Sequence, residues 1–285
     1  MDHLFAGLLD LLREFDNRQL PLTVGGGYGL YLKRRHLTSA GARTLFEALP
    51  EARSTNDIDL FLRADIVADT TRLAAVAEAV SALRYQPVDT AKFLQWTRGV
   101  MIGGVEQPMK LDILVGPLDR VRGKVKADDR RARAKGFKGE LHAHPTEEAL
   151  RIDENPIPVP VAGRTSDGDE YAGTVFVPEA FPYLLMKLHA FADQKDKAAK
   201  ELGRHHAIDA YSVVGMMTED EYDRAERFSR EDRDTEPVRR ARRIVAEDFG
   251  SETALGMLRM REHPLFHDEF ETGQFIAVLR HLFAE

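Results

Sequence analysis

Two aspartates stand two residues apart inside the apolar segment 56–62, which reads NDIDLFL. The segment predicts a β-strand, and residues i and i+2 of a strand point to the same face, so Asp57 and Asp59 would lie side by side. Adjacent carboxylates repel each other, and burying them without a partner is costly. The strand must therefore turn one face to a core and leave the other open to solvent or to a cation. An exposed strand with its acids in solvent is the simpler alternative.

Three consecutive glycines, Gly25-Gly26-Gly27, follow the short apolar segment 20–24 and precede a predicted helix. Glycine lets the backbone approach a ligand closely, and the N–H groups at the start of a helix suit a phosphate. The motif is not a Walker loop, because no Gly-Lys-Ser/Thr follows it. A tight strand-to-helix turn without a ligand is the alternative.

A third carboxylate, Asp112, stands in the middle of the apolar segment 109–115. Alternation along a strand places Leu111, Ile113 and Val115 on one face and Asp112 on the other. A carboxylate at such a position is uncommon unless it is paired, solvated or bound to a metal. Asp112 is therefore a candidate partner of the two earlier aspartates.

The pattern of the chain changes after residue 177. The preceding part alternates predicted helices (3–16, 66–84) with predicted strands (91–101, 106–115) and extended pieces in 153–177, and Gly103-Gly104 favours a hairpin turn. The segment 116–140 is basic and predicts an exposed helix. The remainder predicts helices only, with a break at Gly203 and a capping box from Thr218 to Glu221. We therefore expect an α/β (α+β) domain with a mixed sheet over 1–177 and a helical domain over 178–285.

Composition excludes several kinds of chemistry. The chain has no cysteine, which rules out disulfides, thiolate nucleophiles and cysteine-ligated zinc. It has no apolar run long enough for a membrane span and no basic leader, so we expect a cytoplasmic protein. The net charge of −7 excludes a uniformly basic nucleic-acid binder, yet nine Lys and Arg residues lie between Arg120 and Lys138. That run could hold the phosphates of an RNA, or it could be a solvated helix face.

The order of these features resembles the polymerase-beta-like nucleotidyltransferase superfamily. The matching residues are the glycine turn, the Thr55-Asn56-Asp57-Ile58-Asp59 motif and the later strand aspartate Asp112. Downstream, Lys187 lies in the helical segment 184–190, and Asp209 closes the segment RHHAID. This second set is similar to the lysine and downstream aspartate motifs of the AbiEii/MenT-type nucleotidyltransferase toxins.

The resemblance implies a role for each matching position. Asp57, Asp59 and Asp112 would be catalytic residues that hold a two-metal Mg²⁺ site, and Asp112 would also be a base for the incoming hydroxyl. Gly26 and Gly27 would cradle the triphosphate of a nucleoside triphosphate, and Lys187 would reach it from the helical part. Thr55 and Asp209 would complete the nucleotide-binding residues.

The resemblance also implies an activity. A nucleotide would pass from the nucleoside triphosphate to an acceptor hydroxyl, with RNA such as tRNA as the expected acceptor. The protein would be the toxin of a toxin–antitoxin or phage-defence pair, with a cognate antitoxin as its partner. Two alternatives stay open: a nucleotidyltransferase acting on a small-molecule hydroxyl, and a nucleotide-binding module that has lost catalysis.

Overall fold

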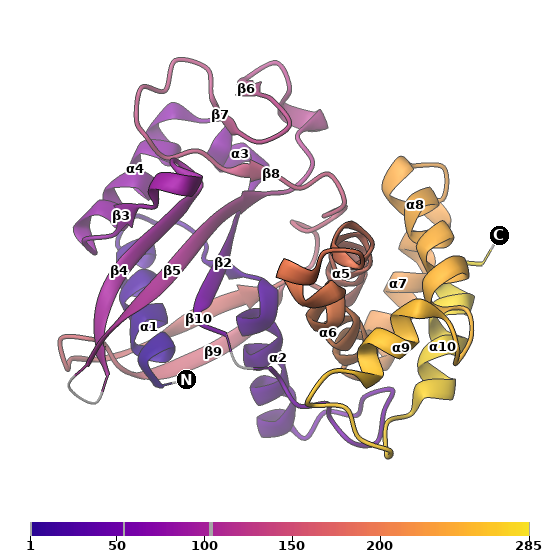
Figure 1. Ribbon diagram of the computed structural model, residues 1–285. Helices are drawn as coiled ribbons and strands as arrows, with labels where there is room; N and C mark the ends of the chain where they lie inside the picture. Colours follow the sequence, from indigo (N-terminus) through magenta and orange to yellow (C-terminus); the bar gives the residue numbers. More distant parts are fainter. Residues whose placement is uncertain (1, 54, 103–104, 285) are drawn as a thin grey trace. The chain divides into compact units, whose positions relative to one another are not determined.

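The computed structural model describes residues 2–53, 55–102 and 105–284 (Figure 1). The chain divides into two compact units. The first comprises residues 1–32, 54–147 and 153–178, and the second comprises 33–53, 148–152 and 179–285. The last crossing of the chain from the first unit into the second follows Pro178. Two earlier segments also belong to the second unit, so it is not a continuous stretch of sequence.

The first unit is built on a mixed sheet whose strand order is β3-β4-β5-β2-β1-β10-β9, with β8 beside β5. The β2–β5, β1–β10 and β5–β8 pairs are parallel, and the other pairs are antiparallel. The strands are β1 (Thr23–Val24), β2 (Asp57–Leu62), β3 (Gln86–Pro87), β4 (Gln95–Ile102), β5 (Val105–Val115), β8 (His144–Pro145), β9 (Ile157–Arg164) and β10 (Glu170–Val177). The predicted mixed sheet is therefore confirmed, as are its strands at 56–62 and 106–115.

Helices α1 (Asp2–Asp16) and α4 (Thr70–Ala82) cover one face of this sheet (Figure 1). Apolar residues of α1 recur at helical spacing, and six of them are almost fully buried: Leu4, Leu8, Leu9, Leu11, Leu12 and Phe15. Short helix α3 (Ala64–Val67) precedes α4, whose first turn is capped by Asp69. The core of the first unit therefore lies between these helices and the sheet.

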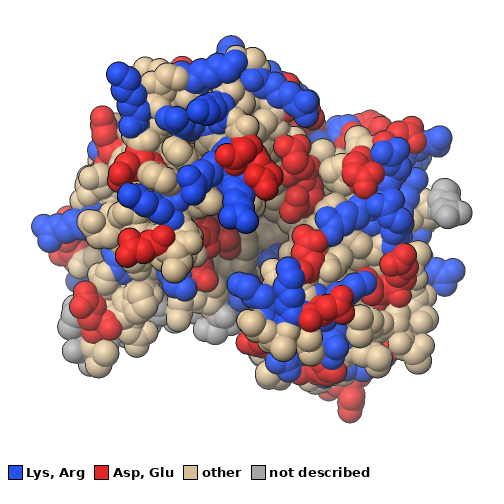
Figure 2. Space-filling view, turned by 45° about the horizontal axis from the view of Figure 1, so that its top comes forward, with Lys and Arg blue, Asp and Glu red and all other residues tan. Residues whose placement is uncertain are grey.

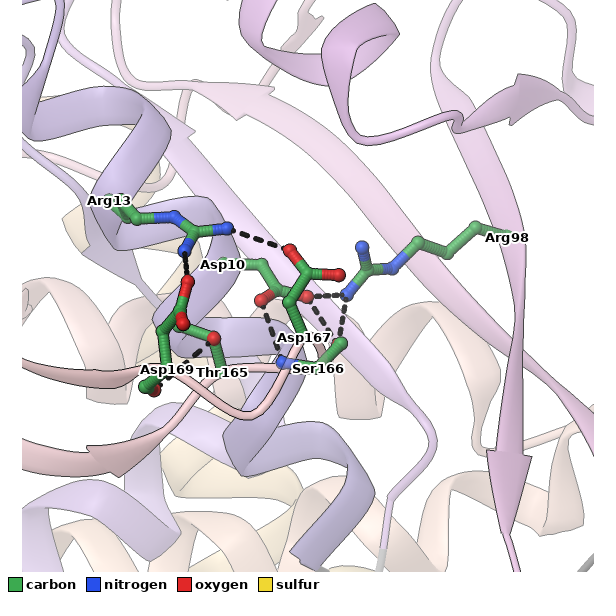
Figure 3. Close-up of polar contacts among 7 residues, drawn as sticks. All are labelled: Asp10, Arg13, Arg98, Thr165, Ser166, Asp167 and Asp169. Atoms are coloured by element: carbon green, nitrogen blue, oxygen red, sulfur yellow. Dashed lines mark hydrogen bonds and ion pairs between the residues drawn. The ribbon is translucent and has the colours of Figure 1, made fainter.

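A charged network with the buried Asp10 at its centre joins α1 to β4 and to the turn between β9 and β10 (Figure 3). Arg98 on β4 donates to the buried carboxylate of Asp10 at 2.5 Å. The same carboxylate accepts from the backbone N–H and the hydroxyl of Ser166, at 2.9 and 2.5 Å. Arg13 pairs with Asp167 and Asp169 in the same turn. These contacts fix the face of the sheet that lies under α1.

The predicted helix over 116–140 is wrong. The segment instead carries a two-stranded sheet, β6 (Val125–Ala127) and β7 (Ala132–Ala134). The reason is local, because the Asp128 carboxylate accepts from the N–H groups of Arg130 and Arg131, both at 2.8 Å, and so fixes a turn. Val125, Ala132 and Ala134 alternate into the interior, which buries apolar area that an exposed helix would not.

The second unit is helical, as the sequence predicted. Its helices are α5 (Ala180–Gln194), α6 (Arg204–Gly215), α7 (Glu219–Glu231), α8 (Glu236–Ile244), α9 (Leu255–Arg261) and α10 (Thr272–Leu282), with a π-helical turn at Val245–Phe249. Gly203 breaks the first helical segment with a φ of 74°. The capping box of Thr218 and Glu221 begins α7, as expected. Glu221 also accepts from the buried ammonium of Lys33 at 2.6 Å.

Helix α2 (Gly26–Ala40) contributes residues to both units. After it, residues 41–53 have no helix or strand, and the backbone N–H of Leu45 donates to the Met217 carbonyl at 2.9 Å. In the described part of the chain, no helix has both the length and the apolar character that a membrane crossing requires.

Candidate active site

Asp59 and Asp112 are direct neighbours across the parallel pair of β2 and β5. Ile58 and Leu60 on β2, and Leu111 and Ile113 on β5, are buried in the core. Alternation therefore sends the aspartates of both strands to the opposite face, where they are half-buried. Asp57 lies on the same face as Asp59, so the three carboxylates that the sequence singled out share one surface of the sheet.

Burial raises the pKa of Asp112 to about 6, and the negative charges of Asp59 and Asp57 add to this effect. The shift is the expected response of a carboxyl group that is desolvated next to like charges. A carboxyl group with such a pKa is able to take up or release a proton near neutral pH.

Gln95 on β4 holds the third carboxylate in place. Its side-chain amide donates to Oδ1 of Asp112 at 2.8 Å, and this hydrogen bond partly offsets the rise in the pKa of Asp112. The antiparallel register places the two residues opposite each other. No sequence motif marks Gln95, although a two-residue hairpin turn at Gly103-Gly104 predicts this pairing. The hairpin glycines themselves lie outside the described residues, whereas Ile102 and Val105 pair as that turn requires.

Lys110 is the cationic side chain of the same face. It is paired with Asp57 in the β2–β5 register and stands two residues before Asp112 on β5. Its side chain is half-buried and forms no ion pair with any residue that the structure describes. Its positive charge also lowers the pKa of Asp112. A lysine of this kind is available for a negatively charged ligand.

The glycine turn lies directly against the carboxylates. The N–H of Gly25 donates to the Asp59 carbonyl at 2.8 Å, and α2 begins at Gly26. Gly26 has a φ of 61°, and a Cβ built on it would stand 1.6 Å from Oδ2 of Asp59. Only glycine fits here, both for its backbone conformation and for the space that Asp59 takes. Gly27 lies in the first turn of the helix.

The donor set of the face suits Mg²⁺, which prefers carboxylate oxygens. In the side-chain arrangement of the described residues, however, no three acidic or histidine groups already form a complete metal site. Thr55 lies beside the set, where its hydroxyl accepts from the N–H of Asp57 at 3.3 Å. A cation between the aspartates would relieve the repulsion that contributes to the raised pKa of Asp112.

Lys187 and Asp209 form a buried ion pair in the second unit. The ammonium of Lys187 donates to Oδ2 of Asp209 at 2.7 Å, and both side chains are less than a tenth exposed. Arg53 donates to both oxygens of the same carboxylate at 3.2 Å. Burial alone would raise the pKa of Asp209, but the charges of Lys187 and Arg53 outweigh it and lower the pKa to about 2. The sequence predicted neither the ion pair of Lys187 with Asp209 nor the contact of Arg53 with the same carboxylate.

Three histidines lie near this pair. Burial and the charge of Lys187 lower the pKa of His206 to about 3, and its Nδ1 is buried without a hydrogen-bond partner in the described structure. Nδ1 of His205 lies 2.9 Å from Nε2 of His263. Burial and His205 lower the pKa of His263 to about 4. His206 and His263 therefore stay neutral at physiological pH.

The basic segment forms a surface on the first unit, which we call the β6–β7 surface. Figure 2 shows Lys and Arg side chains gathered at the top of that view, over the part that carries β6 and β7 in Figure 1. Six exposed residues of this surface form no ion pair with a described residue: Lys124, Lys126, Arg130, Arg131, Lys135 and Lys138.

Aromatic rings accompany the β6–β7 surface, which the sequence did not predict. Phe93 stacks on His142 with ring centres 4.9 Å apart, and the Arg131 guanidinium lies 5.0 Å from the centre of the Phe93 ring. Phe93 has a φ of 78°, an unusual conformation for a bulky residue. It stands two residues before Gln95, the residue whose amide donates to Asp112.

No protein-family model matches the chain, and no curated protein matches it. In the comparison with solved structures, the solution structure of the antibiotic-resistance factor ANT(2'')-Ia matches it with 14% identity and a TM-score of 0.34. That match covers 82% of this chain and 97% of the other. A likeness this distant does not assign a family, so the resemblance to the AbiEii/MenT-type toxins stays a prediction.

Proposed function

We propose that the protein is a Mg²⁺-dependent nucleotidyltransferase that moves a nucleotide from a nucleoside triphosphate to an acceptor hydroxyl. The observation that carries this proposal is the placement of Asp57, Asp59 and Asp112 on one face of the sheet. The glycine turn at Gly26 lies directly against that face. This combination supplies oxygen ligands for a cation. It places them next to a helix N-terminus, whose backbone N–H groups suit a phosphate.

The three aspartates would hold the Mg²⁺, which when bound neutralises phosphate charge and stabilises the attacking and leaving oxygens. Lys110 would bind a phosphate oxygen beside them, since it faces the same surface and has no described ion-pair partner. Gly26 and Gly27 would let the backbone approach the triphosphate. Thr55 would fix the start of the aspartate strand through its contact with Asp57.

Asp112 would take up the proton of the acceptor hydroxyl. Its Oδ1 accepts from Gln95, which leaves Oδ2 to face the cation and the acceptor hydroxyl. The acceptor oxygen forms a bond to the α-phosphorus while the bond from that phosphorus to the bridging oxygen breaks. Pyrophosphate leaves, and the protein contributes mainly positioning and charge.

The β6–β7 surface favours an RNA as the acceptor. The exposed cations of the β6–β7 surface suit a phosphate backbone, because such contacts give affinity without sequence preference. The Phe93 and His142 rings beside Arg131 add groups on which an unpaired base could stack. A role as a toxin, and a cognate antitoxin as its partner, rest on the family resemblance alone.

For the second unit, the resemblance implies that Lys187 and Asp209 contact the nucleotide. Lys187 would have to exchange its buried contact with Asp209 for a phosphate oxygen. Arg53 would then remain as the partner of Asp209. This role is a separate part of the proposal, and the carboxylate face does not depend on it.

Incubation of the protein with Mg²⁺, the four nucleoside triphosphates and total RNA tests the proposal. Mass spectrometry of the recovered RNA should find nucleotide-extended molecules, and pyrophosphate should accumulate in the same reaction. Pyrophosphate release that needs an added small hydroxyl compound, with unmodified RNA, would replace RNA by a small-molecule acceptor. Triphosphate binding without any pyrophosphate release would overturn the catalytic proposal.

A further inference from the structure

The second unit contains a large hollow whose described lining lies entirely within residues 226–284. Its volume is about 730 Å³. It lies among the C-terminal end of α7, helix α8, the π-helical turn and the C-terminal end of α10. Five arginines line it: Arg230, Arg233, Arg239, Arg242 and Arg243. The described carboxylates in the lining are three: Glu226, Asp234 and Glu247. We call this site the arginine hollow.

Arg242 is the arginine of this hollow that has a buried polar atom without a hydrogen-bond partner. Its Nε is buried and has no hydrogen-bond partner, and its guanidinium forms no ion pair with a described residue. Arg242 also lines a second hollow of about 450 Å³, which contains Arg280. The two hollows share four lining residues, so they adjoin each other: Arg242, Ala246, Phe283 and Ala284. Arg280 likewise forms no ion pair with a described residue. Two guanidinium groups are therefore available to a ligand.

The other arginines of the hollow are paired in ways that a ligand can replace. Arg239 and Arg243 share Glu236 at 3.2 and 3.0 Å, and Arg230 pairs with Glu226 at 3.3 Å. All three arginine side chains are more than half exposed. Exposed pairs of this kind contribute little to stability and are weakened by salt. A multiply charged anion would therefore compete for these guanidinium groups.

The backbone beside the hollow is unusual. Val245–Phe249 forms a π-helical turn directly after α8, and Ala246 and Glu247 of that turn contribute to the lining. Such turns are rare and frequently occur at functional sites. The hydroxyl of Ser229 donates to the Leu282 carbonyl, which ties α7 to the end of α10 at this place. The arginines are thus carried by helices that are fastened to each other.

We propose that the arginine hollow binds phosphate groups of a phosphorylated ligand. The planar guanidinium fork matches phosphate oxygens, and charge-assisted contacts of this kind are the strong ones. Five arginines and the volume of the hollow fit several linked phosphates better than one. The ligand is therefore either a free polyphosphate or the backbone of a nucleic acid. This site does not include the residues of the carboxylate face. Phosphate binding here is therefore tested independently of the proposed transferase activity.

Binding measurements in EDTA test the proposal, because without Mg²⁺ the carboxylate face has no cation to hold a phosphate. Inorganic tripolyphosphate is titrated by calorimetry, and a fluorescent single-stranded oligoribonucleotide is titrated by anisotropy, both at physiological ionic strength. Arg242→Gln/Arg280→Gln should weaken binding of at least one probe by about tenfold or more. Weakened tripolyphosphate binding identifies a free polyphosphate site, whereas weakened RNA binding alone identifies a nucleic-acid backbone.

Two further variants keep the result interpretable. Arg227→Gln removes an arginine of α7 that does not line the hollow, and it should leave both affinities within about twofold. Arg242→Lys/Arg280→Lys keeps the charge and should retain most of the binding lost in the glutamine variant. The proposal is overturned if neither probe binds, or if the double glutamine variant binds both probes as the Arg227→Gln control does. Circular dichroism melting of each variant checks that the helical unit is folded.

Discussion

The carboxylate of Asp59 lies so close to Gly26 that a Cβ on Gly26 would stand 1.6 Å from its Oδ2. The glycine that begins α2 and the aspartate in the middle of β2 therefore determine each other's position. Any side chain on Gly26 would displace this carboxylate, whose residue is the neighbour of Asp112 on β5. The glycine motif thus has a function at this site beyond allowing a turn.

Gly26→Ala should reduce pyrophosphate release about 100-fold, since displacements of about 1 Å at a reacting site have effects of that size. The positive φ of Gly26 should also cost about 1–2 kcal/mol of stability. Gly41→Ala is the matched control, because Gly41 has a φ of 59° and nothing within 4 Å of a built Cβ. Equal losses of activity in both variants would show that strain alone, and not the position of Asp59, accounts for the effect.

Gln95→Leu should lower the rate of pyrophosphate release by about 10- to 100-fold, the usual effect of removing a group that orients a ligand side chain. The physical reason is the loss of the 2.8 Å hydrogen bond that fixes Oδ1 of Asp112. Thr97→Val serves as the control, since it removes a hydroxyl contact to the Met109 carbonyl on the same pair of strands. If both variants turn over like the wild type, Gln95 has no part in positioning Asp112.

Lys187→Met should lower the free energy of unfolding by about 3–5 kcal/mol, because it leaves the Asp209 carboxylate buried with less compensation. The double variant Lys187→Met/Asp209→Leu should recover much of this loss, since it removes both buried charges. Urea unfolding followed by circular dichroism measures the two values. A single variant as stable as the wild type would mean that the buried pair does not form.

His206 should make the protein less stable in mild acid. Its pKa is about 3 in the folded state and about 6.5 in an unfolded chain, so between these pH values the unfolded state binds the extra proton. Stability is therefore complete above pH 6.5 and falls as the pH drops through this window, by about 2 kcal/mol at pH 5. His206→Gln should flatten this part of the stability curve. An unchanged slope between pH 5 and pH 7 would contradict the assignment.

Much of the structure of the first unit can be predicted from local patterns in the sequence. Alternation along β2 and β5 placed Asp59 and Asp112 on the open face, because a strand with one buried face allows only that arrangement. The capping box at Thr218 is equally local, since its two hydrogen bonds join residues three positions apart. In each case the decisive pattern lies within a short stretch of the sequence.

Other features depend on contacts that no local pattern contains. The segment 116–140 is rich in good helix formers, yet the Asp128 turn and the burial of Ala132 and Ala134 make it a hairpin. Lys187 has the spacing of an exposed helical lysine, and only the packing of α5, α6 and residues 33–53 brings Asp209 and Arg53 to it. Phe93 and His142 stack although 49 positions separate them in the printed sequence.

The most direct test of the account is the rate of pyrophosphate release from a nucleoside triphosphate with Mg²⁺ and RNA, compared among wild type, Asp59→Asn and Asp112→Asn. Both variants keep the size of the side chain and remove one negative charge from the face. We expect a loss of at least about 100-fold in each, with melting temperatures close to that of the wild type. Wild-type turnover in either variant would contradict it.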